Sequence, residues 1–407
     1  MHIDLLSPAS FAAGHPHDQY DWLREHAPVY RHDEPDGPGF WVLTRHEDVA
    51  AVGRDPATYS SEPTIMIGDP APGAELSFGD HKMMLMMDPP AHTEYRKIIS
   101  REFTQGPAAA LQPRVEALSR MIVDEIIEAG ECDFVSAVAG ELPSYVIAEL
   151  VGIPLEDGRK LYELTETIHS AAEAVPEGAQ AAAVMQMFAY AQQVYDAKRA
   201  APGDDLASKI IHARVDGKQL DSVDFQLFFL LLIDAGGDTT RNLVAGGLHA
   251  LLQHPETLAA LRRDPTLVPG AREELLRWVS PVIYMRRTAT RDTRIGDQTI
   301  RAGDKVVRYF GAANWDPRTF AEPGRLDIRR EPNPHIAFGA GAHVCLGQHI
   351  ARVEIDAMLK EVLGRLHDIE LTEPPEWLAS NFISGIRRMP IRFRAGRRSR
   401  TTAGTEH

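Results

Sequence analysis

A single cysteine in a glycine-rich stretch is the first feature of this sequence that suggests chemistry. Cys345 lies in the run FGAGAHVCLG, which extends from Phe338 to Gly347. A long helical pattern over residues 346–366 follows, so Cys345 is predicted at or near a helix N-terminus. Backbone N–H groups and the positive end of the helix dipole favour a thiolate over a thiol at such a position. The glycines of the run let the chain approach a flat partner closely.

The lack of further cysteines close to Cys345 in the sequence limits the kind of metal centre that it could bind. The chain has only two cysteines, Cys132 and Cys345, and no CxxC spacing. Zinc and iron–sulfur centres need several sulfur or imidazole ligands, whereas one thiolate is enough as an axial ligand of haem iron. The glycine spacing fits neither a dinucleotide-binding fingerprint nor a phosphate-binding loop. The alternative for Cys345 is a buried helix-start residue without chemistry, which the glycine context disfavours. Cys132 lacks that context and is predicted to be a small buried residue.

A long apolar helix carries the second group of reactive side chains. Residues 222–254 have the pattern of one helix, and the run FQLFFLLLIDAGGDTTRNLVAGG within it is apolar on almost every side. Gly236 and Gly237 are expected to weaken or bend this helix, each costing roughly 1 kcal/mol relative to alanine. Asp238 and Thr239 follow directly, and a buried acid–alcohol pair can orient water and relay protons. A helix kink with a satisfied polar pair is the alternative.

Both segments resemble those of the cytochromes P450. The cysteine run is similar to the haem-binding loop of that family, F-G-x-G-x-H-x-C-x-G, at every fixed position, and AGGDT at 235–239 is similar to its distal helix motif. The resemblance covers nearly the whole chain and implies a mainly α fold, with a large helical domain and small β-sheets. It also implies haem b with Cys345 as the iron ligand, and Asp238 and Thr239 as catalytic residues. Further haem contacts are implied for Ala235, Gly236, Phe338, Gly339 and Gly347.

Cations for the two haem propionates are implied by further matches to the family, because carboxylates inside a protein are costly without partners. The segment DPPAHTEYR, residues 88–96, resembles D-P-P-x-H-T-x-x-R of the family and nominates His92 and Arg96. Arg287 and His343 match two further propionate contacts. An exposed charge is the ordinary reading of a lone arginine, but four matches in the expected chain order outweigh it.

A third motif concerns structure and not catalysis. Glu274 and Arg277 match the E-x-x-R signature of the family, with opposite charges three residues apart on one helix. The resemblance implies that this pair is buried and held by a second arginine from the segment before the cysteine run. Arg325 is the matching candidate.

The substrate pocket is expected to be mostly apolar, which suits a hydrophobic substrate. Residues 83–87 and 168–187 are possible walls, although a methionine stripe such as 83–87 is more often core. The segments 278–289 and 380–386 are similar to those of bacterial cytochromes P450 that act on steroids, terpenoids and alkyl chains. A steroid-like or terpenoid substrate is therefore implied. The pocket candidates are Leu231, Asp234, Ala235, Val282, Ile283, Met285, Phe382 and Ile383.

Asp234 departs from the family pattern, which usually has an apolar residue at this position. It lies four residues before Asp238, so both carboxylates share a helix face. A hydrogen bond to a neighbouring helix or loop is the favoured interpretation. A contact with a polar group of the substrate is the alternative.

Electrons must come from other proteins, since the chain has neither an FAD fingerprint nor a cysteine cluster. The resemblance implies a ferredoxin and its NAD(P)H-dependent reductase, with Lys97, Arg101 and Arg352 able to receive an acidic ferredoxin. The main hypothesis is a monooxygenase that inserts one atom of O2 into its substrate. A peroxide-driven peroxygenase and a haem-binding or sensor protein without turnover are the alternatives. The intact Asp238–Thr239 pair disfavours both.

Composition is that of an ordinary globular protein. The 407 residues include 43 Lys and Arg against 58 Asp and Glu, a formal net charge of −15. This charge argues against general binding to nucleic acid or to an anionic membrane. No secretory signal, no membrane-spanning run and no disulfide framework is visible, so we expect a cytoplasmic protein. Residues 1–394 are predicted to form a single domain, and 395–407 a disordered tail.

Helices must position most of these residues, because helical spacing of apolar side chains dominates the sequence. The strand-like pieces are short and indicate only a small β component. Helices are predicted over 107–130, 142–152, 157–172, 178–200, 222–254 and 346–366, and strands over 38–43, 295–300, 305–310 and 389–393.

Overall fold

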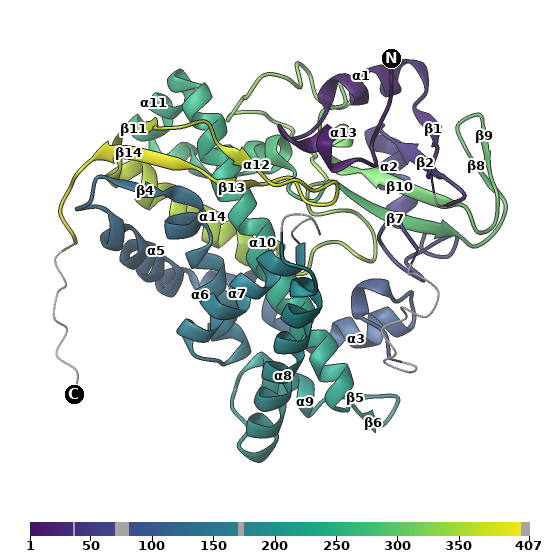
Figure 1. Ribbon diagram of the computed structural model, residues 1–407, viewed down its shortest axis with the longest axis horizontal. Coiled ribbons are helices and arrows are strands. Elements are labelled where there is room, and N and C mark those ends of the chain that lie inside the picture. Colours follow the sequence, from purple (N-terminus) through teal and green to yellow (C-terminus); the bar gives the residue numbers. More distant parts are fainter. Residues whose placement is uncertain (36, 70–80, 170–174, 400–407) are drawn as a thin grey trace.

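The computed structural model describes residues 1–35, 37–69, 81–169 and 175–399. Helices form most of this structure and the strands are short, as the sequence predicts (Figure 1). The helices are α1 (His17–His26), α2 (His46–Arg54), α3 (Ala91–Ile99), α4 (Gln105–Ala110), α5 (Gln112–Ile126), α6 (Glu141–Val151), α7 (Leu155–His169), α8 (Ala179–Ala200), α9 (Leu206–Ile211), α10 (Ser222–Gln253), α11 (Pro255–Arg263), α12 (Val268–Val279), α13 (Phe310–Asn314) and α14 (Gln348–Arg365). The strands are β1 (Val29–His32), β2 (Phe40–Leu43), β3 (Tyr59–Ser60), β4 (Glu131–Asp133), β5 (Arg214–Val215), β6 (Lys218–Gln219), β7 (Tyr284–Ala289), β8 (Thr293–Ile295), β9 (Gln298–Ile300), β10 (Lys305–Tyr309), β11 (His367–Leu371), β12 (Glu376–Trp377), β13 (Ile386–Arg388) and β14 (Pro390–Arg394).

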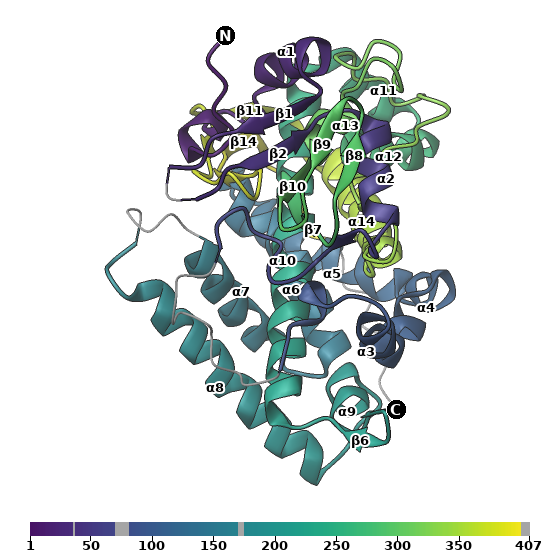
Figure 2. The same ribbon diagram turned by 90° about the vertical axis from the view of Figure 1, so that its right-hand side faces the viewer.

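The long helix α10 passes through the middle of the molecule (Figures 1 and 2). It packs against α6, α7, α8, α12 and α14, so most of its side chains are buried. Asp221 caps its N-terminus by accepting hydrogen bonds from the N–H groups of Val223 and Asp224. Asp224 in turn accepts a hydrogen bond from the N–H of Asp221. This reciprocal capping box fixes the residue at which the helix begins.

Two glycines in the middle of α10 allow close packing of its neighbours. The helix continues without a break through Gly236 and Gly237. A Cβ at Gly236 would lie 3.2 Å from Ile147 of α6, and a Cβ at Gly237 would lie 3.2 Å from Tyr162 of α7. The sequence predicts a weakened or bent helix at this point. The structure adds a packing role, because a side chain at either position would push α6 or α7 away.

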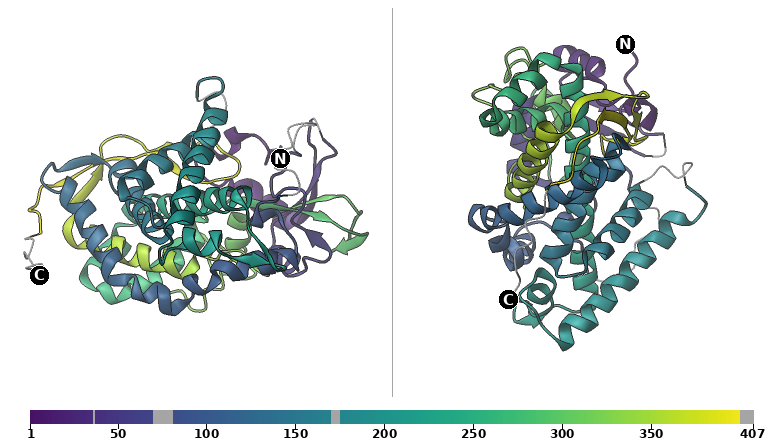
Figure 3. Two further views of the ribbon diagram at one scale, coloured as in Figure 1. Left: turned by 90° about the horizontal axis from the view of Figure 1, so that it is seen from below. Right: turned by 90° about the vertical axis from the view of Figure 1, so that its left-hand side faces the viewer.

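Helices cover α10 on several sides. α7 and α8 lie along one flank of it, as Figure 2 and the views of Figure 3 show, and α9 also packs against it. The largest hydrophobic cluster joins α5, α6, α8, α10 and α14, with Ile122, Val146, Met187, Phe225 and Met358 among its members. Burial of this apolar surface is the main stabilising effect in the helical part of the fold.

The largest sheet has five strands in the order β1-β2-β10-β7-β3. Its middle strand, β10, runs parallel to β2 and antiparallel to β7. α1, α2 and α13 lie beside this sheet at one end of the molecule (Figure 2). A three-stranded sheet in the order β11-β14-β4 lies on the opposite side in Figure 1. The β component is therefore distributed over small sheets at the edges of the helical part.

Two predicted elements are divided in the structure. Residues 107–130 form α4 and α5 and not one helix, and α5 has a proline in its first turn. Proline suits a first turn because it has no N–H to donate, so it marks the start of a new helix. Residues 295–300 belong to the β8–β9 hairpin, in which Gly296 has a φ of 55°. A positive φ at the turn allows the chain to reverse, and the prediction of one strand is wrong.

The chain leaves the last strand along α5. The N–H of Gly396 donates to the carbonyl of Ile127 (2.9 Å), and the N–H of Ser399 donates to the carboxylate of Asp124 (2.8 Å). The predicted disordered tail therefore does not begin at residue 395. Residues 400–407 lie outside the described residues, as do 170–172 of the helix predicted over 157–172.

Among the described residues, no single helix is both long and apolar enough to cross a membrane. One bent pair of segments, Val135–Val151 with Leu155–Ile168, reaches the required length and composition only when both are counted together.

Candidate active site

The loop that carries Cys345, residues 338–347, is fixed by backbone contacts just before α14. The N–H of Cys345 donates to the carbonyl of Phe338 (2.8 Å). Gly339 and Gly341 have φ angles of 75° and 83°, which favour glycine. A Cβ at Gly341 would come within 1.8 Å of the carbonyl oxygen of Gly53, so no larger residue fits there. The cysteine loop is therefore tight and presents one thiol near the start of a helix.

Opposing effects act on the thiol of Cys345. Burial has the largest effect and raises its pKa. The N–H groups of Gly347 and Gln348 lower the pKa, as do the charges of Arg96 and Arg352. The helix start thus acts in the predicted direction, but burial outweighs it. A positive metal ion bound to the sulfur would favour the thiolate again.

Four basic side chains lie next to this loop, and two of them, Arg287 and His92, are buried. Arg287 of β7 is 3% exposed, and its Nη1 donates to the backbone carbonyl of Arg286 (2.8 Å). The ring centroids of His92 of α3 and His343 of the loop are 3.9 Å apart. Arg96 of α3 donates to a backbone carbonyl of the loop (2.7 Å). The structure thus brings together the four residues that the sequence nominates as propionate contacts.

The charge of Asp88 acts on Arg287 and His92, but Asp88 forms no ion pair with either of them and accepts hydrogen bonds from Ser60 and Ser61 instead. Burial lowers the pKa of Arg287 to about 10, that of His92 to about 4 and that of His343 to about 2. The Nδ1 atom of His92 is buried without a hydrogen-bond partner in the described part of the chain. No described carboxylate forms a hydrogen bond with Arg287 or His92. Such a group fits a bound dianion, and the two propionates of haem provide one.

α10 contributes its middle turns to the same site. Ala235 is exposed and Thr239 is half-buried, although most of this helix is buried. The hydroxyl of Thr239 donates to the carbonyl of Ala235 (3.1 Å). Exposure of an alanine in the middle of a central helix indicates open space beside it. Asp234 is half-buried in the preceding turn.

Asp238 forms an ion pair that the sequence did not predict. Its Oδ1 lies 3.0 Å from Nη2 of Arg241, and Arg241 also pairs with Glu166 of α7. The Oδ2 atom of Asp238 is buried without a hydrogen-bond partner in the described residues. One oxygen of the carboxylate is thus held while the other is available. The spacing of three residues between Asp238 and Arg241 was the signal that could have revealed this pair.

A second buried acid approaches α10 from α14. The hydroxyl of Thr240 donates to the carboxyl of Glu354 (3.3 Å), and burial raises the pKa of Glu354 to about 8. An isolated glutamate in a helix pattern gives no sign of such burial. This contact could therefore not be predicted from the sequence.

The E-x-x-R pair is buried as expected, but its second arginine is a different residue. Arg277 donates twice to Glu274, at 2.7 and 2.9 Å, and both side chains are fully buried. The arginine that joins them is Arg330, whose Nε lies 3.1 Å from Glu274. Arg325 is exposed and pairs with Glu322, so its assignment was wrong. The loop after α13 turns Arg330, five residues later, towards the pair.

The predicted pocket segments meet in part. Val282 pairs with Ile383 in an isolated β-bridge, and the N–H of Ile283 donates to the carbonyl of Phe382 (2.8 Å). Ile283 is fully buried, whereas Met285 is half-buried on β7. The side chains of these segments therefore divide between core and possible wall.

The other candidate walls are less informative. Met84 and Met87 belong to the buried core, which is the more common role of a methionine stripe. Leu231 of α10 is 9% exposed. Part of the 168–187 region, residues 170–174, lies outside the described residues.

The proposed ferredoxin contacts differ in their exposure and in their ion pairs within the protein. Lys97 is exposed and pairs with Glu94 (2.6 Å), and Arg101 is exposed. Arg352 is bound to Glu273 by two hydrogen bonds, at 2.8 and 3.0 Å, and its guanidinium lies over the ring of Phe338. Arg352 therefore supports the cysteine loop and is not a free surface charge.

Cys132 lies in β4 and is half-buried. Burial raises the pKa of its thiol to about 12. A thiol of this kind is not reactive at neutral pH. The surroundings of the two cysteines thus differ as predicted, because only Cys345 lies in a glycine-rich loop next to arginines.

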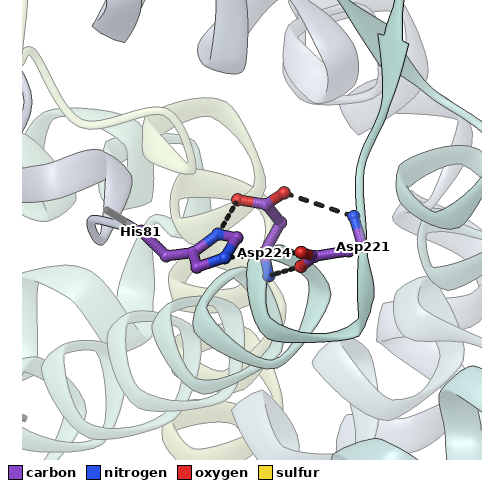
Figure 4. Close-up of side chains that lie close together, drawn as sticks. All are labelled: His81, Asp221 and Asp224. Atoms are coloured by element: carbon purple, nitrogen blue, oxygen red, sulfur yellow. Dashed lines mark hydrogen bonds and ion pairs between the residues drawn. The ribbon is translucent and has the colours of Figure 1, made fainter. Parts of the chain in front are cut away.

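A histidine and two aspartates lie close together at the start of α10 (Figure 4). Nδ1 of His81 is 3.0 Å from Asp224, and Nε2 of His81 is 3.3 Å from Asp221. Asp224 also accepts a hydrogen bond from the hydroxyl of Tyr95 of α3 (3.1 Å). Both carboxylates serve the capping box already described. The group therefore ties α3 and the residue after the 70–80 segment to the beginning of α10.

Comparison with known proteins identifies the family. A sequence model described as cytochrome P450 matches residues 143–380. The chain is 33% identical to the steroid C26-monooxygenase of Rhodococcus jostii, over 96% of this chain and 85% of the relative. It is 37% identical to the methyl-branched lipid omega-hydroxylase of Mycobacterium tuberculosis, over 91% of this chain and 89% of the relative. A Mycobacterium marinum cytochrome P450 solved in complex with pseudoionone superposes with a TM-score of 0.90 at 36% identity, covering 97% of this chain and 99% of the other.

The chain belongs to the cytochrome P450 family. It has the fold of that family and is a haem-dependent monooxygenase. The mainly α architecture and the enzyme class expected from the two sequence motifs are thereby confirmed.

Proposed function

We propose that this monooxygenase hydroxylates a lipophilic small molecule, steroid-like or terpenoid, with electrons from a separate ferredoxin and its NAD(P)H-dependent reductase. The observation that carries this proposal is the thiol of Cys345 beside basic side chains, Arg287 and His92 among them, that form no hydrogen bond with a described carboxylate. The largely apolar residues at the candidate pocket favour a hydrophobic substrate. Relatives that are named for steroids and methyl-branched lipids support the same class.

The cofactor in this proposal is haem b. Cys345 would bind the iron, and His92, Arg96, Arg287 and His343 would hold the propionates. When bound, haem supplies the activation of O2 and the insertion of one oxygen atom into the substrate. The remaining contacts with the ring would come from Ala235, Gly236, Phe338, Gly339 and Gly347.

Asp238 and Thr239 would deliver protons. The hydroxyl of Thr239 donates to the carbonyl of Ala235, which fixes the position of its Oγ1 atom. The Oδ2 atom of Asp238 is free to accept a hydrogen bond from water and to pass a proton towards Thr239. Arg241 holds the other oxygen and limits the directions in which the carboxylate can turn.

The alternatives are a peroxide-driven peroxygenase and a haem-binding or sensor protein without turnover. A proton-delivering pair is needed when O2 is the oxidant, but peroxide already carries its protons. Product formation should be measured with a ferredoxin system and O2, with hydrogen peroxide alone, and with neither. We expect product mainly in the first case. Product mainly with peroxide would support a peroxygenase, and no product from any substrate would contradict turnover.

The substrate class requires its own experiment. Spin-state shifts of the haem should be recorded with panels of steroids, terpenes and fatty acids. We expect tight binding and a high-spin shift for steroid-like or terpenoid molecules. Shifts with fatty acids alone would contradict this part of the proposal and leave the reaction class intact. A cytoplasmic location and a single domain over 1–394 remain predictions.

A further inference from the structure

Arg308 is a buried cation for which the motifs give no role. It lies on β10, the middle strand of the five-stranded sheet, and is 2% exposed. Its Nε and Nη1 atoms are buried without hydrogen-bond partners in the described part of the chain. Burial lowers its pKa well below the ordinary value of arginine, and the charge of Arg287 adds to that effect. A group this costly to bury requires a compensating partner.

The sheet register places Arg308 on the same face as Arg287. Arg308 pairs with Met285 across the β10–β7 ladder, and Val306 pairs with Arg287. Directly opposed residues share a face, and residues two apart on one strand share it as well. Arg308 and Arg287 are therefore diagonal neighbours on one face.

The opposite face of the same two strands provides an internal comparison. Arg286 and Lys305 alternate with the first pair and are equally buried, at 3% and 2% exposed. Lys305 pairs with Glu34 at 2.9 Å and with Asp69 at 2.8 Å, and Asp69 also pairs with Arg286. Carboxylates of the chain thus neutralise the cations of one face. No described carboxylate forms an ion pair with the cations of the other.

The surroundings of Arg308 show where its missing partner belongs. A Cβ at Gly53 would lie 2.2 Å from Nη1 of Arg308 and 2.8 Å from the carbonyl oxygen of Ala340. The guanidinium is therefore close to the end of α2 and to the cysteine loop. The charge of Arg287 acts on Arg308, and the charge of Arg308 acts on His343. The ring of Phe310, 5.3 Å away, offers only a cation–π contact, which does not neutralise the charge.

We propose that Arg308 is a further positioning residue for the haem propionates, and that with Arg287 it neutralises their carboxylates. This inference rests on the proposed haem contacts. Two carboxylates would then face the cations of this side of the sheet, as Glu34 and Asp69 face those of the other. The protein with Arg308 should lose haem more slowly than a variant without this charge. Its haem should also have a more positive reduction potential, because a nearby cation favours the ferrous over the ferric state.

The test compares native haem with haem dimethyl ester, in which both propionates are neutral. Arg308→Met removes the charge and retains most of the length, and Arg308→Lys retains the charge. Each holoenzyme is mixed with an acceptor apoprotein, and the rate of haem transfer is measured. We expect Arg308→Met to lose native haem about ten-fold faster or more, as for a lost charge-assisted contact. Loss of the ester should differ less than about two-fold between Arg308→Met and the wild type. Arg308→Lys should lie closer to the wild type.

Controls separate this role from a purely structural one. Arg286→Met removes a cation from the opposite face, and it should affect the loss of both haems to the same degree. The reduction potential should fall in Arg308→Met and should not fall in Arg286→Met. Equal acceleration for native haem and the ester in Arg308→Met, with an unchanged potential, would overturn the proposal. If Arg308→Met does not fold, the same comparison is made with Arg308→Lys and Arg308→Gln. Failure of the wild type to bind haem at all would instead contradict the proposed haem contacts.

Discussion

At the scale of single residues, the two oxygens of the Asp238 carboxylate differ in their contacts. Arg241 holds Oδ1 at 3.0 Å, while Oδ2 is buried without a partner in the described residues. A carboxylate in this state is well placed but not free to rotate. In the proposed proton delivery, Asp238 would therefore be the acid and Arg241 the residue that orients it.

Asp238→Asn tests this arrangement. The amide keeps the shape and a hydrogen bond but cannot carry a proton, so product formation should fall about ten- to hundred-fold. The solvent isotope effect should rise, because proton delivery would limit the rate. Substrate binding, followed by the spin-state shift, should remain as in the wild type. Unchanged turnover in Asp238→Asn would exclude Asp238 from proton delivery.

For Asp234, a contact with a polar group of the substrate is the alternative to the favoured hydrogen bond within the protein. If it contacts a polar group of the substrate, Asp234→Val should weaken binding of that substrate about ten-fold and change the position of hydroxylation. Asp234→Asn, the matched control, retains a polar side chain and should have a smaller effect. An analogue without the polar group should bind both variants equally well. Unchanged affinity and regiochemistry in Asp234→Val would leave only a contact within the protein.

At the scale of elements, the contact between α10 and α14 contains a buried acid. Glu354 of α14 accepts a hydrogen bond from Thr240, and burial raises its pKa to about 8. Thr240 lies one residue after Thr239. The same contact therefore holds together the helix that follows the cysteine loop and the helix that carries Asp238 and Thr239.

Stability should depend on pH through Glu354. A carboxyl whose folded pKa lies above its unfolded value contributes stability that is fully present below the unfolded pKa and is lost as the pH rises. The difference in unfolding free energy between wild type and Glu354→Gln should therefore change between about pH 4.5 and 8, in favour of the variant at high pH. Denaturant unfolding across this range measures it. A constant difference would show that Glu354 does not titrate there.

At the scale of the whole molecule, arginines and acids far apart in the sequence tie the elements together. Glu274 of α12 accepts hydrogen bonds from Arg277, from Arg330 and from the backbone N–H of Asp327. Glu273, the preceding residue, binds Arg352 beside the cysteine loop. These contacts connect α12 to the chain on both sides of the loop.

Arg330 and Arg325 provide a matched pair for testing this connection. Arg330→Leu leaves a buried carboxylate with one partner fewer and should cost about 3 kcal/mol of unfolding free energy. Arg325→Leu removes an exposed charge and should change stability by less than about 0.5 kcal/mol. Denaturant unfolding of both holoenzymes gives the comparison. Equal effects of the two substitutions would mean that the E-x-x-R pair does not need Arg330.

The sequence predicted the features that depend on local residue patterns and missed those that depend on the packing of distant segments. Helical periodicity predicted the long helices, and short motifs singled out Cys345 and the four basic residues that the structure places near its loop. Arg308 was missed because the pattern of a strand does not show which face of the sheet will lack acidic side chains. Arg330 was missed because counting back from the cysteine loop does not show how the intervening chain turns.

The central claim is that the thiolate of Cys345 binds the haem iron. The most direct measurement is the carbon monoxide difference spectrum of the reduced holoenzyme, with Cys345→His as the variant and Cys132→Ser as the control. We predict the strongly red-shifted Soret band of a thiolate ligand in the wild type and in Cys132→Ser, and its loss in Cys345→His. A folded, haem-loaded wild type without that band, or a Cys345→His variant that retains it, would contradict the claim.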